Sequence, residues 1–541
     1  MIQSRMDHKK AAVLAVIEAV VVMRTSQALS APATYPLETN VIAAAGSFVP
    51  GPAGRVFNVT NCGAFCDGTH DDTAAVQKAI NAAEAAGGGV VEFPGGTCLL
   101  NSCHPSSHPW FFYNLLIGSN VKLSGTAGAK LLQGPGGRHP PAIHAREVRN
   151  TVLAFGLDYA TVRFQNTAFN GGFFGLKTTT ANDSSVTLRD AANAAIFRVG
   201  DYVAIYSATN GDVIPTEISP VISINSGVGT LGLRDPLARS FANPFLAKVT
   251  SLATTNVGVQ HLIVQGAEPL AVTEAFGFQA QDDQFISDTS IGGCNVFGLN
   301  LNTLRNFQFV DCVFSPVGPA CPALELAQRN SANGLYAGNT FIGASAGFGE
   351  YAAHIRFTRN HFWIHANPSV VAGIFIGGLD VNFDHNEVQC GNVTGGSGWG
   401  VVLADFIGPA EYAGFVGQIR IATNTFRCQA DGNACLGIFG ADTSVTGNTI
   451  VAAGNALGIH AEGPLLQSNR IQGNTILLES GDGILMVTPS TGGSGSVVTG
   501  NTISGAGAHG IHVAARGAPN LGGIVVSNNS ISGFKTPLYF Q

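Results

Sequence analysis

The sequence feature that most constrains the fold is a short phrase, Asn followed two residues later by Ile, Phe or Val, that recurs through the second half of the chain. It occurs at Asn339, Asn360, Asn386, Asn424, Asn448, Asn474, Asn501 and Asn529. Successive positions lie 21 to 38 residues apart. A period in the twenties, built from Val, Ile, Thr and Ser with Gly and Asn breaks, predicts short strands and turns that bury a core only by stacking.

Each phrase therefore predicts one coil of an all-β, single-stranded parallel β-helix. Asn tolerates the left-handed backbone of a bend, and like residues stacked at the strand spacing can hydrogen-bond to one another. We expect a ladder of Asn side chains inside the turn. In two earlier coils, Asp288 and Asp311 are expected to take the place of Asn.

A second phrase, Gly followed by Ile or Val, keeps the same period. In a strand the Ile or Val would face the core, and the next residue would face water. Stacked coils turn these outward positions into a ribbon that suits a linear polymer. The residues expected on this ribbon are Phe375, Val402, Phe439, His460, Leu485 and His512, with Glu325 upstream and Glu462 beside His460.

Composition limits the classes of partner. A chain of 541 residues would normally form several domains, but a solenoid grows by adding coils, so we predict one elongated domain. The net charge of −7 offers no basic face for nucleic acid. No apolar run reaches the roughly 18 residues of a membrane span. No CxxC pair or His/Cys cluster predicts a metal site, and we expect no cofactor.

The N-terminal residues and the cysteines indicate export. Residues 1–31 combine basic residues, an apolar stretch and small residues, which predicts a signal peptide. A disordered or helical extension is the alternative, and residues 32–54 are interpreted as a linker. Four pairs of cysteines lie close in sequence, as is typical of disulfide-bonded extracellular or periplasmic proteins: Cys62/Cys66, Cys98/Cys103, Cys312/Cys321 and Cys428/Cys435.

Residues 55–102 predict a cap for the open end of the solenoid. Asp71 and Asp72 can begin a helix whose inward residues are Val76, Ile80 and Ala83, and a run of three glycines ends it. A strand then starts at residue 90. An amphipathic helix over the last coil would protect unpaired strand edges.

The words FNV, GA, DG, DDTAAVQKAI and GGGVVEFPGGT in this segment resemble the opening of the pectate-lyase superfamily of right-handed parallel β-helix proteins, in particular its rhamnogalacturonase-like and epimerase-like members. The later Asn/Gly coils resemble carbohydrate-binding repeats of the same superfamily, so the likeness spans roughly residues 55–535. It implies an extracellular protein that handles a polysaccharide. The expected organisation of the domain 55–541 is a cap (55–102), irregular coils with insertions (103–270) and regular coils (271–535).

Two groups of carboxylates are candidates for hydrolysis. Gln281-Asp282-Asp283 is similar to the sequence motif that carries the acid and base residues of polygalacturonase-like relatives, although the other motifs of that group are missing. The longest interval between phrases follows Asn386, and solenoids place insertions on one face, often the binding face. A surface loop without function is the alternative interpretation. This interval offers two aromatic residues for stacking on sugars and two acids: Trp399, Tyr412, Asp405 and Glu411.

A third candidate site suits lyases and epimerases. These enzymes need a base that removes the proton beside a uronate carboxylate and a cation that stabilises the carbanion. Tyr351, His354 and Arg356 could fill these roles next to Glu350, with bound calcium as a further cation if the protein is a lyase.

The leading prediction is a secreted glycoside hydrolase that uses two carboxylates in a groove along the β-helix. The runner-up is a polysaccharide lyase or uronate epimerase, and a non-catalytic polysaccharide-binding or adhesin β-helix is the alternative from another class. The carboxylates from which a hydrolytic pair is expected are Asp282, Asp283, Glu325, Asp405 and Glu411.

Overall fold

The computed structural model describes the part of the chain that forms the predicted solenoid. The described residues are 55–102, 104–105, 111–134, 158–164, 169–209, 212–237, 240, 244–249, 255–265, 272–316, 324–329, 331–343, 346–350, 353–364, 374–390, 402–404, 418–429, 434–462, 468–488, 495–515 and 523–541. All of them belong to the compact unit of residues 44–541. The expected signal peptide and linker lie outside them. Among the described residues, no helix has the length and apolar character to cross a membrane.

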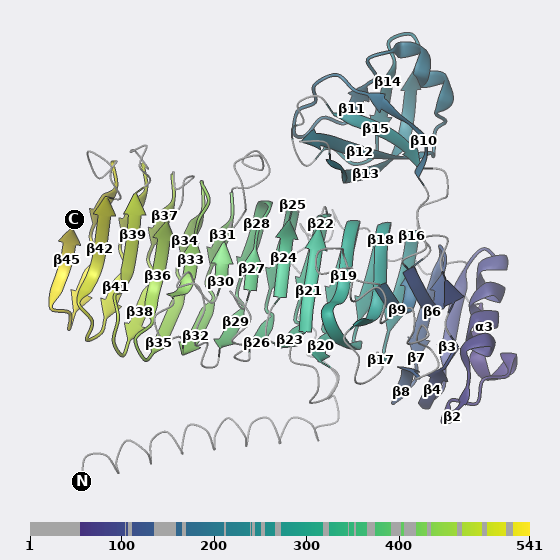
Figure 1. Ribbon diagram of the computed structural model, residues 1–541, viewed down its shortest axis with the longest axis horizontal. Coiled ribbons are helices and arrows are strands. Elements are labelled where there is room, and N and C mark those ends of the chain that lie inside the picture. Colours follow the sequence, from purple (N-terminus) through teal and green to yellow (C-terminus); the bar gives the residue numbers. More distant parts are fainter. Residues whose placement is uncertain are drawn as a thin grey trace, which may run out of the picture. The chain divides into compact units, whose positions relative to one another are not determined.

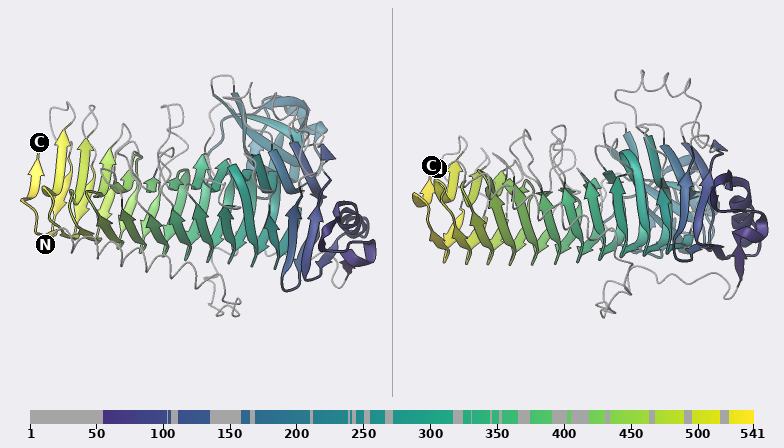
Figure 2. Two further views of the ribbon diagram at one scale, coloured as in Figure 1. Left: turned by 60° about the horizontal axis from the view of Figure 1, so that its bottom comes forward. Right: turned by 90° about the horizontal axis from the view of Figure 1, so that it is seen from below.

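The fold is a right-handed parallel β-helix, which confirms the predicted fold class. The coils contribute strands to three rows, and each row pairs in parallel with the same row of the next coil; the first coil contributes only β1 and β2, to rows 2 and 3. Figures 1 and 2 show the strands of successive coils side by side, from β3 near helix α3 to β45. We number the rows 1 to 3 in the order in which the chain passes through them in each regular coil.

Row 1 consists of β6 (Phe111–Ile117), β9 (Asp158–Phe164), the first part of β18 (Val272–Ser287), the middle of β19 (Ser290–Val310), β21 (Leu324–Arg329), β24 (Ala346–Glu350), β27 (Ile374–Ile376), β30 (Val402–Ala404), β33 (Ala434–Ile438), β36 (Leu457–Glu462), β39 (Ile484–Thr488), β42 (His509–Ala515) and β45 (Thr536–Phe540). The short β5 (His104–Pro105) pairs antiparallel with β6.

Row 2 consists of β1 (Val56–Asn58), β3 (Gly89–Phe93), β7 (Val121–Gly125), β16 (Thr255–Gln260), the ends of β18 and β19, β22 (Ala332–Ala337), β25 (Ala353–Thr358), β28 (Leu379–Asp384), β31 (Arg420–Ala422), β34 (Ser444–Thr446), β37 (Arg470–Gln472), β40 (Val497–Thr499) and β43 (Val525–Ser527).

Row 3 consists of β2 (Asp67–Asp71), β4 (Gly96–Leu100), β8 (Ala129–Gln133), β17 (Ile263–Gln265), the start of β19, β20 (Val313–Pro316), β23 (Thr340–Gly343), β26 (His361–Ile364), β29 (Glu387–Cys390), β32 (Thr425–Gln429), β35 (Thr449–Ala453), β38 (Thr475–Leu478), β41 (Thr502–Ser504) and β44 (Ser530–Ser532).

The Asn phrase occupies the corner between rows 2 and 3, and the predicted ladder is present. The Asn448 backbone N–H and side-chain amide both donate to Asn474 Oδ1, at 2.9 and 3.0 Å. The same amide also donates to the Ile421 carbonyl at 2.9 Å. In turn, Asn448 Oδ1 accepts two hydrogen bonds from Asn424 at 2.9 Å. Each ladder residue therefore satisfies buried polar groups of both neighbouring coils.

The residue before each ladder position has a left-handed backbone. This column holds Asp288, Asp311, Gly338, Arg359 and His385, with φ between 44° and 67°. The expectation that Asp288 and Asp311 replace Asn is therefore wrong by one residue. The ladder position in those coils belongs to Thr289 and Cys312, and Cys312 donates its backbone N–H to Asn339 Oδ1 at 2.9 Å. Asp tolerates the left-handed bend that precedes the ladder.

A second column of left-handed bends lies between rows 1 and 2. Its members include Asn256, Asp283, Asn306, Asn333, His354, Asp380, Gln418, Asp442 and Ser468, with φ between 52° and 58°. Several neighbours in this column bond to each other, as when the Asn333 amide donates to Asn306 Oδ1 at 3.2 Å. The column places polar side chains at regular intervals along one outer edge.

Stacked aromatic rings fill the middle of the core. Phe309, Tyr336 and Phe357 lie in successive coils, with ring centroids 5.1 and 4.8 Å apart and nearly parallel planes. Phe314, Phe341 and Phe362 stack in the same way at 4.7 Å. The centroid spacing matches the distance between hydrogen-bonded strands, so one aromatic ring of each stack comes from each successive coil.

The predicted cap is confirmed as helix α3 (Thr73–Ala85), which has Asp72 as its N-cap residue and buries Val76, Ile80 and Ala83. Gln77 accepts from the Leu116 backbone N–H at 2.8 Å and donates to the Leu116 carbonyl at 2.9 Å. The helix therefore satisfies backbone groups of β6 that no strand pairs, as expected for the protection of an edge.

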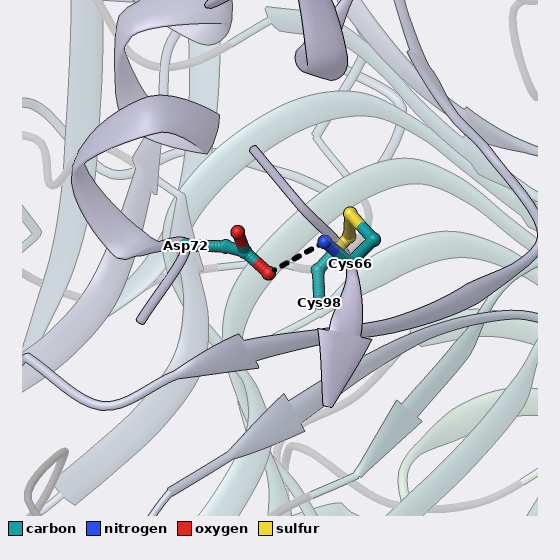
Figure 3. A group of neighbouring side chains, drawn as sticks. All are labelled: Cys66, Asp72 and Cys98. Atoms are coloured by element: carbon teal, nitrogen blue, oxygen red, sulfur yellow. Dashed lines mark hydrogen bonds between the residues drawn. A yellow bond between two sulfur atoms is a disulfide. The ribbon is translucent and has the colours of Figure 1, made fainter. Parts of the chain in front are cut away.

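The described disulfide joins Cys66 to Cys98 (Figure 3). The short-range pairings of Cys62 with Cys66 and of Cys98 with Cys103 are therefore wrong. Cysteines one coil apart meet because β2 and β4 stack. Asp72 lies beside the disulfide and accepts from the Cys66 backbone N–H at 3.0 Å. Cys428 and Cys435 are buried free thiols.

A separate antiparallel sheet interrupts the coils in the region where insertions were expected. Its strands are, in spatial order, β10 (Phe169–Gly175), β15 (Phe245–Val249), β12 (Tyr202–Thr209), β13 (Asp212–Asn225), β14 (Thr230–Leu233) and β11 (Ser185–Thr187). It has its own apolar core, which includes Leu176, Val203, Ile205 and Leu246. We call residues 169–249 the inserted sheet.

Replacing Asn448 with Ala should lower the free energy of unfolding by about 3–5 kcal/mol, because the change leaves several buried donors and acceptors unpaired. Urea denaturation followed by circular dichroism measures the effect. Thr449→Ala, on the outward-facing neighbour, is the matched control and should change stability by less than about 1 kcal/mol. Equal losses in the two variants would contradict a structural role for the ladder.

Candidate functional site

The Asp282–Asp283 pair lies where the inserted sheet meets the β-helix. Asp282 lies on β18 at the bend between rows 1 and 2, aligned with Thr255 of β16, and has no exposed surface. Its Oδ2 accepts from Arg234 at 2.6 Å and from the Tyr202 hydroxyl at 2.9 Å, and its Oδ1 accepts from Asn306 at 2.9 Å. Arg234 and Tyr202 belong to the inserted sheet, so Asp282 links it to the coils.

Further charged side chains surround the ion pair between Arg234 and Asp282. Arg234 also lies 3.5 Å from Asp283 Oδ2 and 2.8 Å from Asp235 Oδ2. Arg305, which is buried on β19, lies 3.4 Å from Asp235 Oδ2. Burial and then the Asp283 charge raise the pKa of Asp282 to about 6. Because burial removes water, the buried charge depends on these fixed partners.

The structure therefore gives Asp282 a definite contact but no exposed surface for a substrate. Asp283 is 28% exposed and sits on a left-handed bend, so the two acids face different surroundings as expected from their adjacency. Their predicted role in hydrolysis stays a prediction. Their observed role is to bind the inserted sheet.

His354 and Asp380 form a second polar pair, on adjacent bends of the column between rows 1 and 2. The imidazole Nδ1 lies 2.7 Å from Asp380 Oδ2, and the side chains are 36% and 46% exposed. The hydrogen bond from His354 lowers the pKa of Asp380. A neutral imidazole that donates Nδ1–H to Asp380 presents the lone pair of Nε2 for proton transfer.

Arg356 follows two residues after His354 and is held by Asp384 of the next coil. Its Nε and Nη2 donate to the two carboxylate oxygens at 2.9 and 3.1 Å, a bidentate geometry that fixes the plane of the guanidinium. Thr358 also donates to Asp384, at 2.7 Å. Although burial opposes it, hydrogen bonds from Arg356, His385 and Thr358 hold the pKa of Asp384 below its usual value.

Strand register corrects part of the predicted ribbon. In row 1, Phe375 aligns with Leu403, Gly437 aligns with His460, and Leu485 aligns with His512. Val402 and Phe439 are therefore not at the predicted positions. Val402 aligns with Ile374, one residue earlier in the repeat. Alternation predicts which side a residue faces but does not fix the register of a coil.

His460 and Glu462 still lie together on row 1, with Nε2 and Oε2 3.1 Å apart. The Phe439 ring meets His460 edge-on, with the centroids 6.4 Å apart. The side chains of His460 and Glu462 are only 9% and 14% exposed. This group is therefore a largely buried pair with little surface for a ligand.

Sequence reasoning missed a cluster at the start of β39 and β42. His509 Nδ1 lies 2.9 Å from Asp482 Oδ2, and His512 Nδ1 lies 3.9 Å from the same oxygen. The Tyr539 ring stacks on His509, with the centroids 4.7 Å apart. Burial and then the His509 charge lower the pKa of His512. The available signal was the spacing of 27 residues between Asp482 and His509, which is one coil.

The backbone positions of three further predicted site residues are defined by the strands of row 1. Glu325 lies on β21, Glu350 ends β24, and Phe375 lies on β27, all in row 1. The residues that lie outside the described residues are Tyr351, Trp399, Asp405, Glu411 and Tyr412. Their roles stay predictions.

The strand geometry and the cap segment agree with comparisons to known proteins. Residues 56–129 match the model of the family described as rhamnogalacturonase A/epimerase, pectate lyase-like, which confirms the predicted resemblance. A stretch of 40 residues is 62% identical to mannuronan C5-epimerase AlgE3 of Azotobacter vinelandii. This stretch is 7% of the chain and 2% of that relative's length.

Two solved structures share the fold at low identity. The tailspike gp49 of Pseudomonas phage LKA1 is 12% identical, with a TM-score of 0.51 over 90% of this chain and 84% of that one. The Gp54 tailspike of Acinetobacter baumannii bacteriophage AP22, solved with a capsular saccharide, is 12% identical, with a TM-score of 0.50 over 89% of this chain and 74% of that one. At this identity the similarity establishes the β-helix alone.

Because the pKa of Asp282 is raised in the folded state, we expect the contribution of Asp282 to the free energy of unfolding to decrease as the pH rises. Between pH 4, near the ordinary pKa of Asp, and pH 6, near the pKa of Asp282, the folded state binds more protons than the unfolded state. The stabilising contribution of the Asp282 proton is therefore fully present below pH 4 and is lost as the pH rises through 6. The loss is on the order of 3 kcal/mol at most. Asp282→Asn should remove this part of the pH dependence.

Urea denaturation midpoints at pH 4 to 7.5 measure the difference between the wild type and Asp282→Asn. Asp442→Asn, on a bend of a later coil, provides the same substitution away from the inserted sheet. Identical pH profiles for the wild type and Asp282→Asn would contradict the burial of a titrating carboxyl at this contact.

Proposed function

We propose that the protein acts on an acidic polysaccharide outside the cell by removing the proton next to a uronate carboxylate, as a uronate epimerase or lyase. The observation that carries the proposal is the exposed His354–Asp380 pair beside the bidentate Arg356–Asp384 pair. It supplies an oriented base and a fixed cation on one edge of the β-helix.

The position of this edge supports contact with a polymer. His354 and Asp380 stand where row 1 turns into row 2, and the corresponding bend of the following coil is Gln418. In the sequence, residues 405–417 separate β30 of row 1 from Gln418, and they include Tyr412, one of the aromatic residues predicted to stack on sugars.

In the proposed chemistry, His354 Nε2 takes the proton from the carbon beside the carboxylate, and Asp380 stabilises the imidazolium that forms. A water molecule that donates a proton to the opposite face of the sugar gives epimerisation, and the imidazolium returns its proton to the hydroxide left behind. Breakage of the neighbouring carbon–oxygen bond, with formation of a carbon–carbon double bond and transfer of a proton from water to the leaving oxygen, gives elimination, after which the imidazolium again neutralises the hydroxide. Arg356 follows His354 by two residues on β25, which suits binding of the substrate carboxylate.

The comparisons favour the same class. The cap segment matches a family described by rhamnogalacturonase and epimerase members, and a short segment is similar to mannuronan C5-epimerases. The Cys66–Cys98 disulfide supports an extracellular or periplasmic location, because such bonds persist in oxidising compartments.

A second candidate function is glycoside hydrolysis by Asp282 and Asp283. The observation that favours it is the pKa of Asp282, which burial raises to about 6 beside a second carboxylate. An acid with a raised pKa next to an ionised carboxylate is the arrangement that hydrolysis needs. Asp282 would first have to become accessible to substrate, because Tyr202 and Arg234 already donate hydrogen bonds to its Oδ2.

The purified protein should be incubated with mannuronate-rich and galacturonate-rich polymers and with neutral polysaccharides, with calcium or a chelator. Proton NMR in D2O detects exchange or inversion beside the carboxylate, ultraviolet absorbance detects the double bond, and a reducing-end assay detects hydrolysis. His354→Gln should lower kcat/KM for the uronate polymer by about 100-fold to 10,000-fold.

His261→Gln is the matched control, because His261 also sits on a left-handed bend with Nδ1 near an Asp carboxylate, 3.8 Å from Asp288 Oδ2, and contacts none of the proposed catalytic residues in the described part of the chain. It should keep full activity. New reducing ends without a double bond, abolished by Asp283→Asn and unaffected by His354→Gln, would replace the proposal with the hydrolase. Binding of polymer without any product would replace it with a non-catalytic binding protein.

A further inference from the structure

We propose that Asp482, His509 and His512 form a binding site for a divalent transition metal, with zinc as the preferred ion. The cluster lies on coils far along the chain from His354 and Asp380. The proposal does not depend on the function proposed above, because it concerns a different set of residues and a binding measurement.

The donor atoms already converge. Asp482 Oδ2 lies 2.9 Å from His509 Nδ1 and 3.9 Å from His512 Nδ1, and one ligand atom of each residue lies within 4.8 Å of the others. Donors around a tetrahedral zinc ion, at bond lengths of 2.0–2.2 Å, lie about 3.3 Å apart. That spacing falls between the two observed distances, so small side-chain rotations would bring all three atoms to one ion.

The backbone holds the ligands in place. Asp482 Oδ1 accepts from the His509 backbone N–H at 2.8 Å, which leaves Oδ2 for the ion. The Gly483 N–H donates to the His509 carbonyl at 3.1 Å. A Cβ at Gly483 would lie 2.3 Å from the Gly510 carbonyl oxygen, so this close approach of the two coils requires glycine. Hydrogen bonds to a ligating carboxylate are the usual way in which proteins orient such ligands.

The surroundings also suit a bound ion. The side chains of Asp482, His509 and His512 are 17%, 23% and 16% exposed, so the site is shielded but open to solvent. The Tyr539 ring stacks on His509 and lies 5.0 Å from His512, which restricts the orientation of both imidazoles. Restricted ligands lose less conformational entropy when the metal binds.

The donor set selects the kind of metal. Two imidazoles and one carboxylate are typical of zinc and non-haem iron sites with an open position. Calcium and magnesium prefer sites made only of oxygen atoms. The three side chains would leave a fourth coordination position of the ion for a water molecule or another small molecule.

The test uses the full chain without a His tag, stripped of metal by a chelator. Isothermal titration calorimetry with zinc chloride should give one tight site, and cobalt chloride should produce the strong visible absorbance of tetrahedral Co²⁺. His509→Ala and His512→Ala should each weaken zinc binding by at least about 100-fold. Saturating zinc should raise the melting temperature of the wild type but not that of His509→Ala or His512→Ala.

His361→Ala is the matched control, because His361 also faces a carboxylate, with Nδ1 3.2 Å from Glu387 Oε2, but has no second imidazole beside it among the described residues. It should leave zinc affinity unchanged. Circular dichroism of each variant shows that the fold is retained. No binding by the wild type, or equal binding by the His509→Ala/His512→Ala double variant, would overturn the proposal.

Discussion

The buried Asn ladder is the interaction on which the rest of the structure depends. Each Asn accepts from the coil before it and donates to the coil after it, so one residue per coil is fixed in register. A parallel β-helix has no hairpins that could set the register of its strands. The ladder supplies this constraint from inside the corner, where an unpaired amide would be costly.

Once one corner is fixed, the outer clusters follow from the length of a coil. Asp282 meets Asn306, His354 meets Asp380, Arg356 meets Asp384, and Asp482 meets His509, and in each pair the partners lie 24 to 28 residues apart. The Cys66–Cys98 disulfide joins residues 32 apart for the same reason. Contacts between polar side chains on this fold therefore arise between neighbouring coils, and His354 and Asp380 also sit on left-handed bends.

The sequence predicted the fold because the Asn and Gly phrases report the repeat directly. It predicted helix α3 because the cap carries its own start and stop signals. It placed Asp288 one residue out of register, since Asp suits the bend as well as Asn suits the ladder. The cysteine pairs failed because closeness along the chain is a poor guide when neighbours are one coil apart.

The candidate sites were harder to predict for a physical reason. The sequence named His354 and Arg356 but gave neither the Asp380 nor the Asp384 partner, because each partner lies on the next coil. It named Asp282 as catalytic but gave no sign that Arg234, 48 residues earlier, would cover it. Contacts between an insertion and the coils depend on tertiary packing that no periodicity encodes.

Hydrogen exchange of backbone amides in Asn386→Ala tests the central claim most directly. Asn386 bonds to Asn360 and Asn424, so its coil lies beside the coil of His354 and carries Asp380 itself. The ladder account predicts that amides of β25 and β28 lose protection together, while helix α3 keeps its own. Loss of protection confined to residue 386, with both strands unchanged, would contradict the account.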